Sequence, residues 1–445
     1  MARANGICHS RRKLGAMCIS MIFFIIAIDY RKRKMIESED EKRKQHVKSD
    51  FLEDVDYALE TMKYMYDMQR GKAEIRDVVE KMLTVSFRTL RHKVYCNIFD
   101  ERRYAVVEGY VREIWQRGWD PRDHFYIPNL ITCPIPRRFD SSTKLFVSIS
   151  SKPCSAQRVA LRVRVSKSEG EKEAVAVCVK GMDFQEDVSI RLVEWLEAQY
   201  LLGVSTVTTY VYTVPKRVKK VLDHYGELGK LEQIPLTLPG HSPNLPLVRS
   251  QYIARNRQQK RRHELIPYND CLYRHISTHR YILILDIDEL VVPMEHNNYF
   301  DLLKAIEQDT SADRTTSLSF PNVFKFPAKL VNQSVPEHLY MLRNSHRSRK
   351  TSDRRNYGKS MTSTANVATV FNHFALHRLT PNVTGTIYVP ETLGVKLHYK
   401  GTCPIESRSE CDELQTDTVP DHSIDRFADE LERRVNRTLS ELRFL

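Results

Sequence analysis

The chain has 445 residues and a mass of 52.1 kDa, with 41% hydrophobic and 28% charged residues. This composition is ordinary for a folded protein with a sizeable core, and it excludes a wholly disordered chain and a polytopic membrane protein. The formal net charge is +13, and residues 1–50, with 12 basic and six acidic side chains, contribute +6 of it. Because a nucleic-acid-binding protein more often concentrates positive charge in its folded part, the overall basicity says little about partners.

The N-terminus contains an apolar segment, residues 14–28 (LGAMCISMIFFIIAI), that lies between two basic clusters. It is shorter than the roughly 17 to 20 apolar residues of a membrane-spanning helix, although flanking Lys and Arg side chains can reach the interface. We expect an uncleaved signal anchor here, between a cytoplasmic tail (1–13) and a stem (29–90). A cleaved signal peptide fits the length but lacks a small-residue cleavage site, and a buried helix of a soluble protein is the third interpretation.

Two segments of different periodicity follow. Residues 51–90 repeat apolar side chains at helical spacing, which predicts a helix in the stem. In residues 91–170 the stretches KLFVSISS and VALRVRVS alternate apolar and polar side chains, as half-buried strands do. We therefore expect a small β-rich subdomain at 91–170, followed by a larger domain at 171–445.

The larger domain begins with alternating strand and helix patterns. Strands are expected at 174–181, 204–214, 230–236 and 281–293, and helices at 189–203, 217–229 and 250–278. This alternation predicts an α/β fold with a mostly parallel sheet and right-handed crossovers. No glycine-rich dinucleotide or P-loop motif follows any of these strands, which argues against a dehydrogenase or a P-loop enzyme.

The most informative segment is Tyr281–Pro293. Five apolar or aromatic residues run directly into Asp286-Ile287-Asp288. On an extended backbone the two aspartates would point to the same side, at the carboxyl end of the strand, where open α/β sheets bind ligands. Paired carboxylates there suit a hard divalent cation that also meets the phosphates of a nucleotide substrate. The alternative is a pair of solvated carboxylates that cap the next turn or helix.

The cysteines and glycosylation sequons bear on the compartment. Nine cysteines are present without a CxxC pair or a zinc-like cluster, which argues against a zinc module. If the body is lumenal, disulfides are plausible. Three N-x-S/T sequons, at Asn332, Asn382 and Asn436, permit secretion without requiring it.

Three ordered motifs resemble glycosyltransferase family 92. They are EWLEAQYLLGVSTVTTYVYTV, NDCLYR and LDIDEL, and the similar stretch runs from about 174 to 398. The resemblance implies a GT-A-like fold, in which helices flank a mixed, mostly parallel sheet. It also implies a type II membrane enzyme of the Golgi or another secretory membrane, with its catalytic domain in the lumen. Such an enzyme would transfer a hexose, galactose in the characterised animal members, from a UDP-sugar to a glycan hydroxyl with inversion, assisted by Mn²⁺.

The resemblance also assigns individual residues. Asp286 and Asp288 match the metal-binding pair, and His398 is a candidate third metal ligand. The residues implied in donor binding are Cys178, Lys180, Asp270, Arg274, Glu289 and Lys400.

Several of these residues have a plainer interpretation. Asp270 and Arg274 are four apart and could form an ordinary intrahelical ion pair. Lys180 could be a solvated strand end, and Trp195, in the first motif, is more typical of a core residue. Lys400 stands where the family usually has Arg, whose planar fork binds a diphosphate differently. His373 is a weaker candidate ligand than His398, and the spacing singles out no catalytic base.

Two other classes of function remain open. A catalytically inactive lumenal relative would keep the fold as a glycan-binding or scaffolding module. A nucleic-acid binder would use the basic stretch 249–263, but the anchor-like N-terminus and the aspartate pair count against it.

Overall fold

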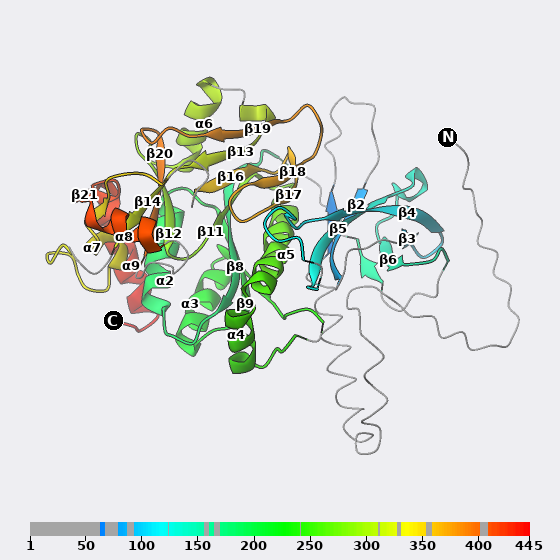
Figure 1. Ribbon diagram of the computed structural model, residues 1–445, viewed down its shortest axis with the longest axis horizontal. Coiled ribbons are helices and arrows are strands. Elements are labelled where there is room, and N and C mark those ends of the chain that lie inside the picture. Colours follow the sequence, from blue (N-terminus) through cyan, green and yellow to red (C-terminus); the bar gives the residue numbers. More distant parts are fainter. Residues whose placement is uncertain are drawn as a thin grey trace, which may run out of the picture. The chain divides into compact units, whose positions relative to one another are not determined.

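The structure of the protein is a computed structural model that describes residues 63–66, 79–86, 93–122, 124–154, 160–163, 170–240, 242–309, 312–326, 331–352, 358–400 and 408–445. The expected tail and anchor lie outside these residues. Within the described part, no helix combines the length and the apolar character needed to cross a membrane. The chain divides into two compact units, residues 1–166 with 239–242, and residues 167–238 with 243–445 (Figure 1).

The first unit contains one antiparallel sheet in the strand order β1-β2-β5-β4-β3-β6-β7. Its strands are β1 Lys63–Tyr66, β2 Val79–Ser86, β3 Val94–Phe99, β4 Tyr104–Glu113, β5 Ile127–Pro134, β6 Phe146–Ser150 and β7 Leu161–Arg162. Alternate residues of β3, such as Val94, Cys96 and Ile98, are buried in the core of this unit. A disulfide between Cys96 and Cys133 joins β3 to β5.

The helix expected across 51–90 is wrong where the structure describes this segment. Residues 63–66 and 79–86 are strands, and β2 pairs with β5 along its whole length, from Val79 opposite Pro134 to Ser86 opposite Ile127. The physical reason is that β5 offers backbone hydrogen bonds over eight residues, and such tertiary pairing overrides a local helical pattern.

The second unit is a mixed α/β domain, as predicted. Its main sheet has the strand order β10-β9-β8-β11-β16-β13-β19, in which β10, β9, β8 and β11 are parallel and β16 runs antiparallel to β11 and β13. The strands are β8 Glu173–Asp183, β9 Thr206–Thr213, β10 Leu231–Pro235, β11 His279–Leu285, β13 Thr315–Phe320, β16 Lys359–Ser363 and β19 Thr384–Tyr388.

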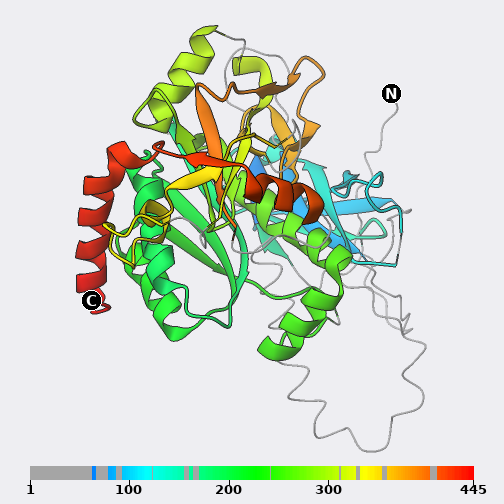
Figure 2. The ribbon, with the colours of Figure 1, turned by 60° about the vertical axis from the view of Figure 1, so that its left-hand side comes forward.

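Helices cover both faces of this sheet. The α-helices described in this unit are α2 Ser189–Leu201, α3 Lys216–Glu227, α4 Pro246–Arg255, α5 Arg257–His275, α6 Tyr299–Asp309, α7 Tyr340–Arg343, α8 Arg408–Thr416 and α9 Ala428–Glu441. Figures 1 and 2 show α2 and α3 on one face, with α9 beside α2, and α5 on the other. The first helix ends before Gly203, whose φ of +90° favours a glycine.

The single helix expected at 250–278 is divided in two. Asn256 separates α4 from α5, and both its backbone N–H and its side-chain amide donate to the carbonyl oxygen of Tyr252. The asparagine therefore accounts for a carbonyl in the last turn of α4, and the chain starts a new helix after it.

The strand expected at 281–293 also breaks. β11 ends at Leu285, and the chain turns through 286–288 into β12 (Glu289–Pro293), which belongs to a small sheet with β20 (Gly394–Tyr399) and β14 (Asn322–Lys325). The N–H of Glu289 donates to the carbonyl of Asp286 at 3.0 Å and closes this turn. Asp286 and Asp288 therefore do not lie on one side of an extended strand, because the chain changes sheets between them.

Two further strand pairs complete the described strands. They are β15 His346–Ser348 with β21 Thr418–Pro420, and β17 Val367–Val370 with β18 Ala375–Arg378.

Candidate functional site

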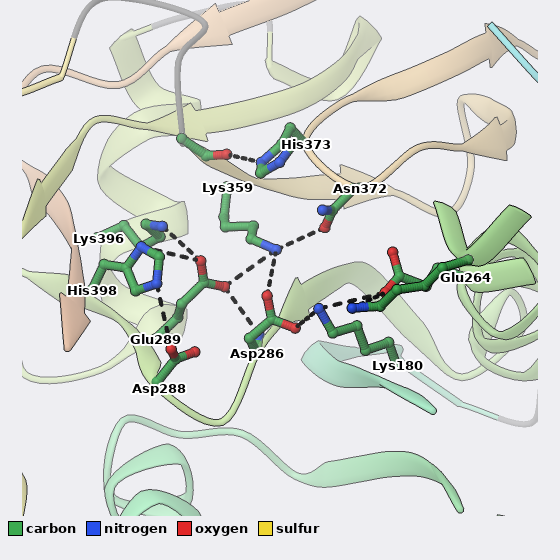
Figure 3. Close-up of polar contacts among 12 residues, drawn as sticks. Lys180, Glu264, Asp286, Asp288, Glu289, Lys359, Asn372, His373, Lys396 and His398 are labelled. Atoms are coloured by element: carbon green, nitrogen blue, oxygen red, sulfur yellow. Dashed lines mark hydrogen bonds and ion pairs between the residues drawn. The ribbon is translucent and has the colours of Figure 1, made fainter. Parts of the chain in front are cut away.

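The candidate site lies at the carboxyl end of β11 and beside the last part of β8, two parallel neighbours whose register pairs Val179 with Leu285. The next residues along each strand therefore meet: the Nζ of Lys180 lies 2.9 Å from Oδ1 of Asp286 (Figure 3). Lys180 is also 3.7 Å from Glu264 of α5. Burial alone would lower the pKa of Lys180, but the two carboxylates raise it well above its ordinary value.

A second carboxylate, that of Glu289, is surrounded by cations. Lys396 of β20 lies 2.7 Å from its Oε1, and Lys359 of β16 lies 3.2 Å from its Oε2. Its side chain is 3% exposed. Burial alone would raise the pKa of Glu289, but Lys359 and Lys396 hold it well below its ordinary value. Glu289 is therefore ionised at neutral pH.

Lys359 links the two carboxylates. Its Nζ lies 3.7 Å from Oδ2 of Asp286, in addition to the contact with Glu289, and it donates to the amide oxygen of Asn372 at 2.8 Å. Burial would raise the pKa of Asp286, but Lys180 and Lys359 together lower it below its ordinary value. The resulting cluster alternates acidic and basic groups (Figure 3).

Asp288 faces away from this cluster and toward His398. In β12 and β20 the register places Glu289 opposite His398, and the Nε2 of His398 lies 3.5 Å from Oδ2 of Asp288. The Asp288 side chain is 44% exposed and that of His398 is 11% exposed. Burial, followed by the charge of Lys396, lowers the pKa of His398, so the imidazole is neutral at neutral pH. A neutral imidazole beside a carboxylate suits a divalent cation.

The three predicted metal ligands therefore do not lie together in one group. Asp288 and His398 lie together, whereas the Asp286 carboxylate pairs with Lys180 and Lys359. Among the described residues, no group of three or more His, Cys, Asp and Glu side chains is gathered closely enough to hold one metal ion. The donor set therefore fits two protein ligands, with oxygen and nitrogen atoms of the kind that Mn²⁺ accepts.

The other predicted donor residues lie in structural networks. Cys178 is buried and forms a disulfide with Cys271, which ties β8 to α5. Asp270 and Arg274 form the intrahelical ion pair, at 2.9 Å. Asp270 also accepts from the hydroxyl of Tyr210 of β9, and Arg274 pairs with Glu232 of β10. These contacts fasten α5 to the sheet.

The last two candidates, His373 and Lys400, lie in different surroundings. His373 donates from Nδ1 to the carbonyl of Gly358 at 2.7 Å, and burial together with Lys359 lowers its pKa to about 3. Lys400 follows the end of β20 and is half-buried, and its backbone N–H donates to the carbonyl of Lys325. His373 therefore holds the segment before β16, close to Lys359 (Figure 3).

The sequence analysis missed Lys359 and Lys396. A signal for Lys396 exists, because Lys396 and His398 alternate with apolar Val395 and Leu397, which puts the two polar side chains on one face of a strand. Glu194, the first residue of the EWLEAQYLLGVSTVTTYVYTV motif, accepts the backbone N–H groups of Met341 and Leu342 at the start of α7. Burial raises the pKa of Glu194 to about 7.

Comparison with known proteins places this geometry in context. A family model described as glycosyltransferase family 92 matches residues 173–435. No curated protein matches the chain. A solved structure described as 4-diphosphocytidyl-2C-methyl-D-erythritol synthase is similar at 12% identity, over 56% of this chain and 100% of that one, with a TM-score of 0.22. A likeness that low carries no argument about this chain.

Proposed function

The chain belongs to glycosyltransferase family 92, and from that premise we propose that it is an inverting, metal-dependent enzyme with a GT-A-like domain. It transfers a hexose, galactose in the first instance, from a UDP-sugar to a hydroxyl of a glycan acceptor. The observation that carries the proposal is the pairing of Asp288 with His398 at 3.5 Å, just beyond the carboxyl end of β11, the kind of position at which open α/β sheets bind ligands.

We propose Mn²⁺ as the cation, held by Asp288 and His398. Bound there, a divalent cation would stabilise the negative charge on the departing nucleoside diphosphate. The protein's own part is to keep both ligands ready: His398 is neutral because its pKa is lowered, and Asp288 is half-exposed beside it. Asp286, the other expected aspartate ligand, is paired with Lys180 and Lys359 and would have to leave both lysines to reach such a cation.

Cationic side chains support the assignment of a phosphate-bearing donor. Lys180, in the last part of β8, is charged because Asp286 and Glu264 raise its pKa, and it is 30% exposed. Lys400 lies just beyond His398 on the same strand end. Both can donate to phosphate oxygens as point charges, although neither offers the fork of an arginine. Cys178, Asp270 and Arg274 serve the donor site indirectly, by holding α5 against the sheet.

The reaction would be a single displacement at the anomeric carbon. The acceptor hydroxyl attacks from the face opposite the departing diphosphate, through an oxocarbenium-like transition state. A carboxylate takes the hydroxyl proton in such a step. Asp286 and Glu289 are poor choices for this base, because lysines hold their pKa values below the ordinary range.

We also propose that the protein is a type II membrane protein of the Golgi or another secretory compartment, with its folded part in the lumen. The apolar segment 14–28 with its basic flanks is the basis for the anchor. Two disulfides, Cys96–Cys133 and Cys178–Cys271, agree with an oxidising compartment. Of the three sequons, Asn332 and Asn382 are exposed.

The test is calorimetric titration of UDP into the full chain, with and without Mn²⁺. We expect binding that requires Mn²⁺ and is lost in Asp288→Ala, while Asp313→Ala, at an exposed aspartate, binds as the wild type does. Equal binding without Mn²⁺ would remove the metal from the proposal. No binding by folded protein would favour the inactive relative that serves as a glycan-binding or scaffolding module.

A further inference from the structure

We infer that Glu289 is a positioning residue that holds the turn carrying Asp286 and Asp288, with Lys359 and Lys396 as its fixed counter-ions, and that it does not itself bind the cation or the donor. We call Glu289 with its contacts to Lys359, Lys396 and the Asp286 N–H the clamp. The clamp rests on contacts within the protein, whereas the role of the turn in binding a cation rests on the proposed function.

Both oxygens of the Glu289 carboxylate are engaged. Oε1 accepts from Lys396 at 2.7 Å, and Oε2 accepts from the backbone N–H of Asp286 at 3.0 Å and lies 3.2 Å from Lys359. Figure 3 shows these contacts converging on one carboxylate. The bond to the Asp286 N–H reaches directly into the turn, so the side chain fixes the backbone that precedes Asp288.

The backbone of Glu289 holds the same turn from the other side. Its N–H donates to the carbonyl of Asp286 at 3.0 Å, and its carbonyl accepts from the indole of Trp195 at 2.7 Å. The carbonyl of Asp288 accepts from the N–H of Tyr399 at 2.8 Å. The turn is therefore tied to α2, β16 and β20 at once, and the carboxylate of Glu289 contacts a lysine from each of the two strands.

Charge explains why this carboxylate stays where it is. Lys359, Lys396 and Glu289 are all buried. Removing the Glu289 charge would leave Lys396 buried without a counter-ion, which is strongly unfavourable. A cation that bound Glu289 would draw its carboxylate away from Lys396 and would likewise leave that buried lysine without its counter-ion. Asp288, by contrast, is half-exposed and can bind a ligand without uncovering a buried charge.

A competing interpretation makes Glu289 a metal ligand that the lysines occupy only while no cation is bound. The two interpretations predict opposite signs for Lys396→Met. If Glu289 is the clamp, losing Lys396 loosens the turn and weakens Mn²⁺ binding. If Glu289 is a ligand, the variant frees it and removes a nearby positive charge, so Mn²⁺ binding becomes tighter.

The first experiment measures Mn²⁺ affinity of the full chain by electron paramagnetic resonance, without nucleotide. We expect Lys396→Met to weaken Mn²⁺ binding about tenfold, the usual scale for a group that orients metal ligands without touching the metal. Lys304→Met, which removes an exposed lysine from α6, is the matched control and should bind as the wild type does. Tighter binding by Lys396→Met would overturn the inference.

The double variant Glu289→Gln/Lys396→Met covers the case in which the single variant fails to fold. It removes the charges of Glu289 and Lys396, keeps an oxygen that can accept the Asp286 N–H, and leaves Lys359 with the Asp286 carboxylate at 3.7 Å as its counter-ion. We expect its Mn²⁺ affinity to stay within about threefold of the wild type, because no buried charge is left unpaired. Loss of Mn²⁺ binding by folded double variant would show that the carboxylate is a ligand and would refute the clamp.

Hydrogen–deuterium exchange separates the clamp from the proposed function. In the absence of metal and nucleotide, the peptide that covers 281–293 should exchange faster in Lys396→Met than in the wild type, with no change in Lys304→Met. Unchanged exchange would count against the clamp. If the wild type binds no Mn²⁺ while exchange rises as expected, the metal-dependent function fails and the clamp stands.

Discussion

The indole N–H of Trp195, in α2, donates a hydrogen bond to the backbone carbonyl of Glu289 at 2.7 Å, and both residues are buried. A residue that packs in the hydrophobic core therefore also holds the first residue of β12, directly after the turn with Asp286 and Asp288. This one hydrogen bond therefore connects the packing of the core to the position of the turn.

Replacing the indole should weaken both. Trp195→Phe leaves the carbonyl of Glu289 buried without its donor and opens space in the core, and we expect a loss of about 2–4 kcal/mol in the free energy of unfolding. Urea denaturation measures it. Trp119→Phe, at an indole that is 52% exposed, is the control. A loss below about 0.5 kcal/mol, as for a surface substitution, would contradict the structural role.

Gly181 follows Lys180 and has no room for a side chain. A Cβ there would overlap the ring of Tyr212. We expect Gly181→Ala to destabilise the protein by about 1–3 kcal/mol through overpacking, and to weaken UDP binding because β8 must shift next to Lys180. Gly118→Ala is the matched control, since nothing lies within 4 Å of the Cβ position there. Calorimetry and urea denaturation of both variants check this, and equal behaviour would refute it.

The Cys178–Cys271 disulfide closes a loop with a sequence separation of 93 residues. We expect Cys178→Ser/Cys271→Ser to lose about 2–5 kcal/mol of stability, because the unfolded chain regains the freedom that the cross-link removes. Urea denaturation under oxidising conditions measures the loss. The wild type treated with a reductant should move toward the variant, and a variant as stable as the oxidised wild type would argue against the bond.

Buried histidines predict a loss of stability in acid. Burial lowers the pKa values of His263 and His275 to about 3. In the unfolded chain they titrate near 6.5, so their contribution is complete above that pH and is lost as the pH falls from about 6.5 toward 3. Each should contribute a slope of about 1.4 kcal/mol per pH unit in this window.

Urea midpoints at pH 7.5 and pH 5.5 test this. His275→Gln should reduce the dependence on pH, whereas His422→Gln, at a side chain that is 78% exposed, should leave it unchanged. The same pH dependence in wild type and His275→Gln would show that His275 does not carry the effect.

Lys400 offers a test of donor binding by gain of function. The resemblance to the family leads us to expect Arg at this position, and Arg binds a diphosphate through two parallel hydrogen bonds. Lys400→Arg should therefore strengthen UDP binding in the presence of Mn²⁺ by about three- to tenfold, as measured by calorimetry. Lys304→Arg controls for a general effect of arginine on the surface. Unchanged or weaker binding would place Lys400 outside the donor site.

Local patterns predicted much of the larger domain. The β-branched run at 174–181 became β8, and the amphipathic stretch at 189–203 became α2, because each needs only its own periodicity and a nearby core. The helix expected in 51–90 failed for the converse reason, since the pairing of β2 with β5 depends on residues some fifty positions away. The long helix breaks at Asn256 through hydrogen bonds to Tyr252, four residues earlier, so this break depends on neighbours in the sequence.

The candidate site divides in the same way. The sequence by itself determined that Asp286 and Asp288 stand at the end of a buried strand, and it named Lys180 and His398 as neighbours in function. The sequence could not show that the chain changes sheets after Leu285, because the turn is set by the pairing of β12 with β20. As a result of this turn, Asp286 contacts lysines whereas Asp288 contacts His398.

Only the tertiary structure brought Lys359 and Lys396 to Glu289. Lys396 is 107 residues away in the chain, and Lys359 comes from a strand of the other sheet. Periodicity reports which side of a strand a residue faces, but not which distant strand faces it. The charges that hold Asp286 and Glu289 ionised are supplied across that distance, so the electrostatics of the site followed from the fold rather than from any local pattern.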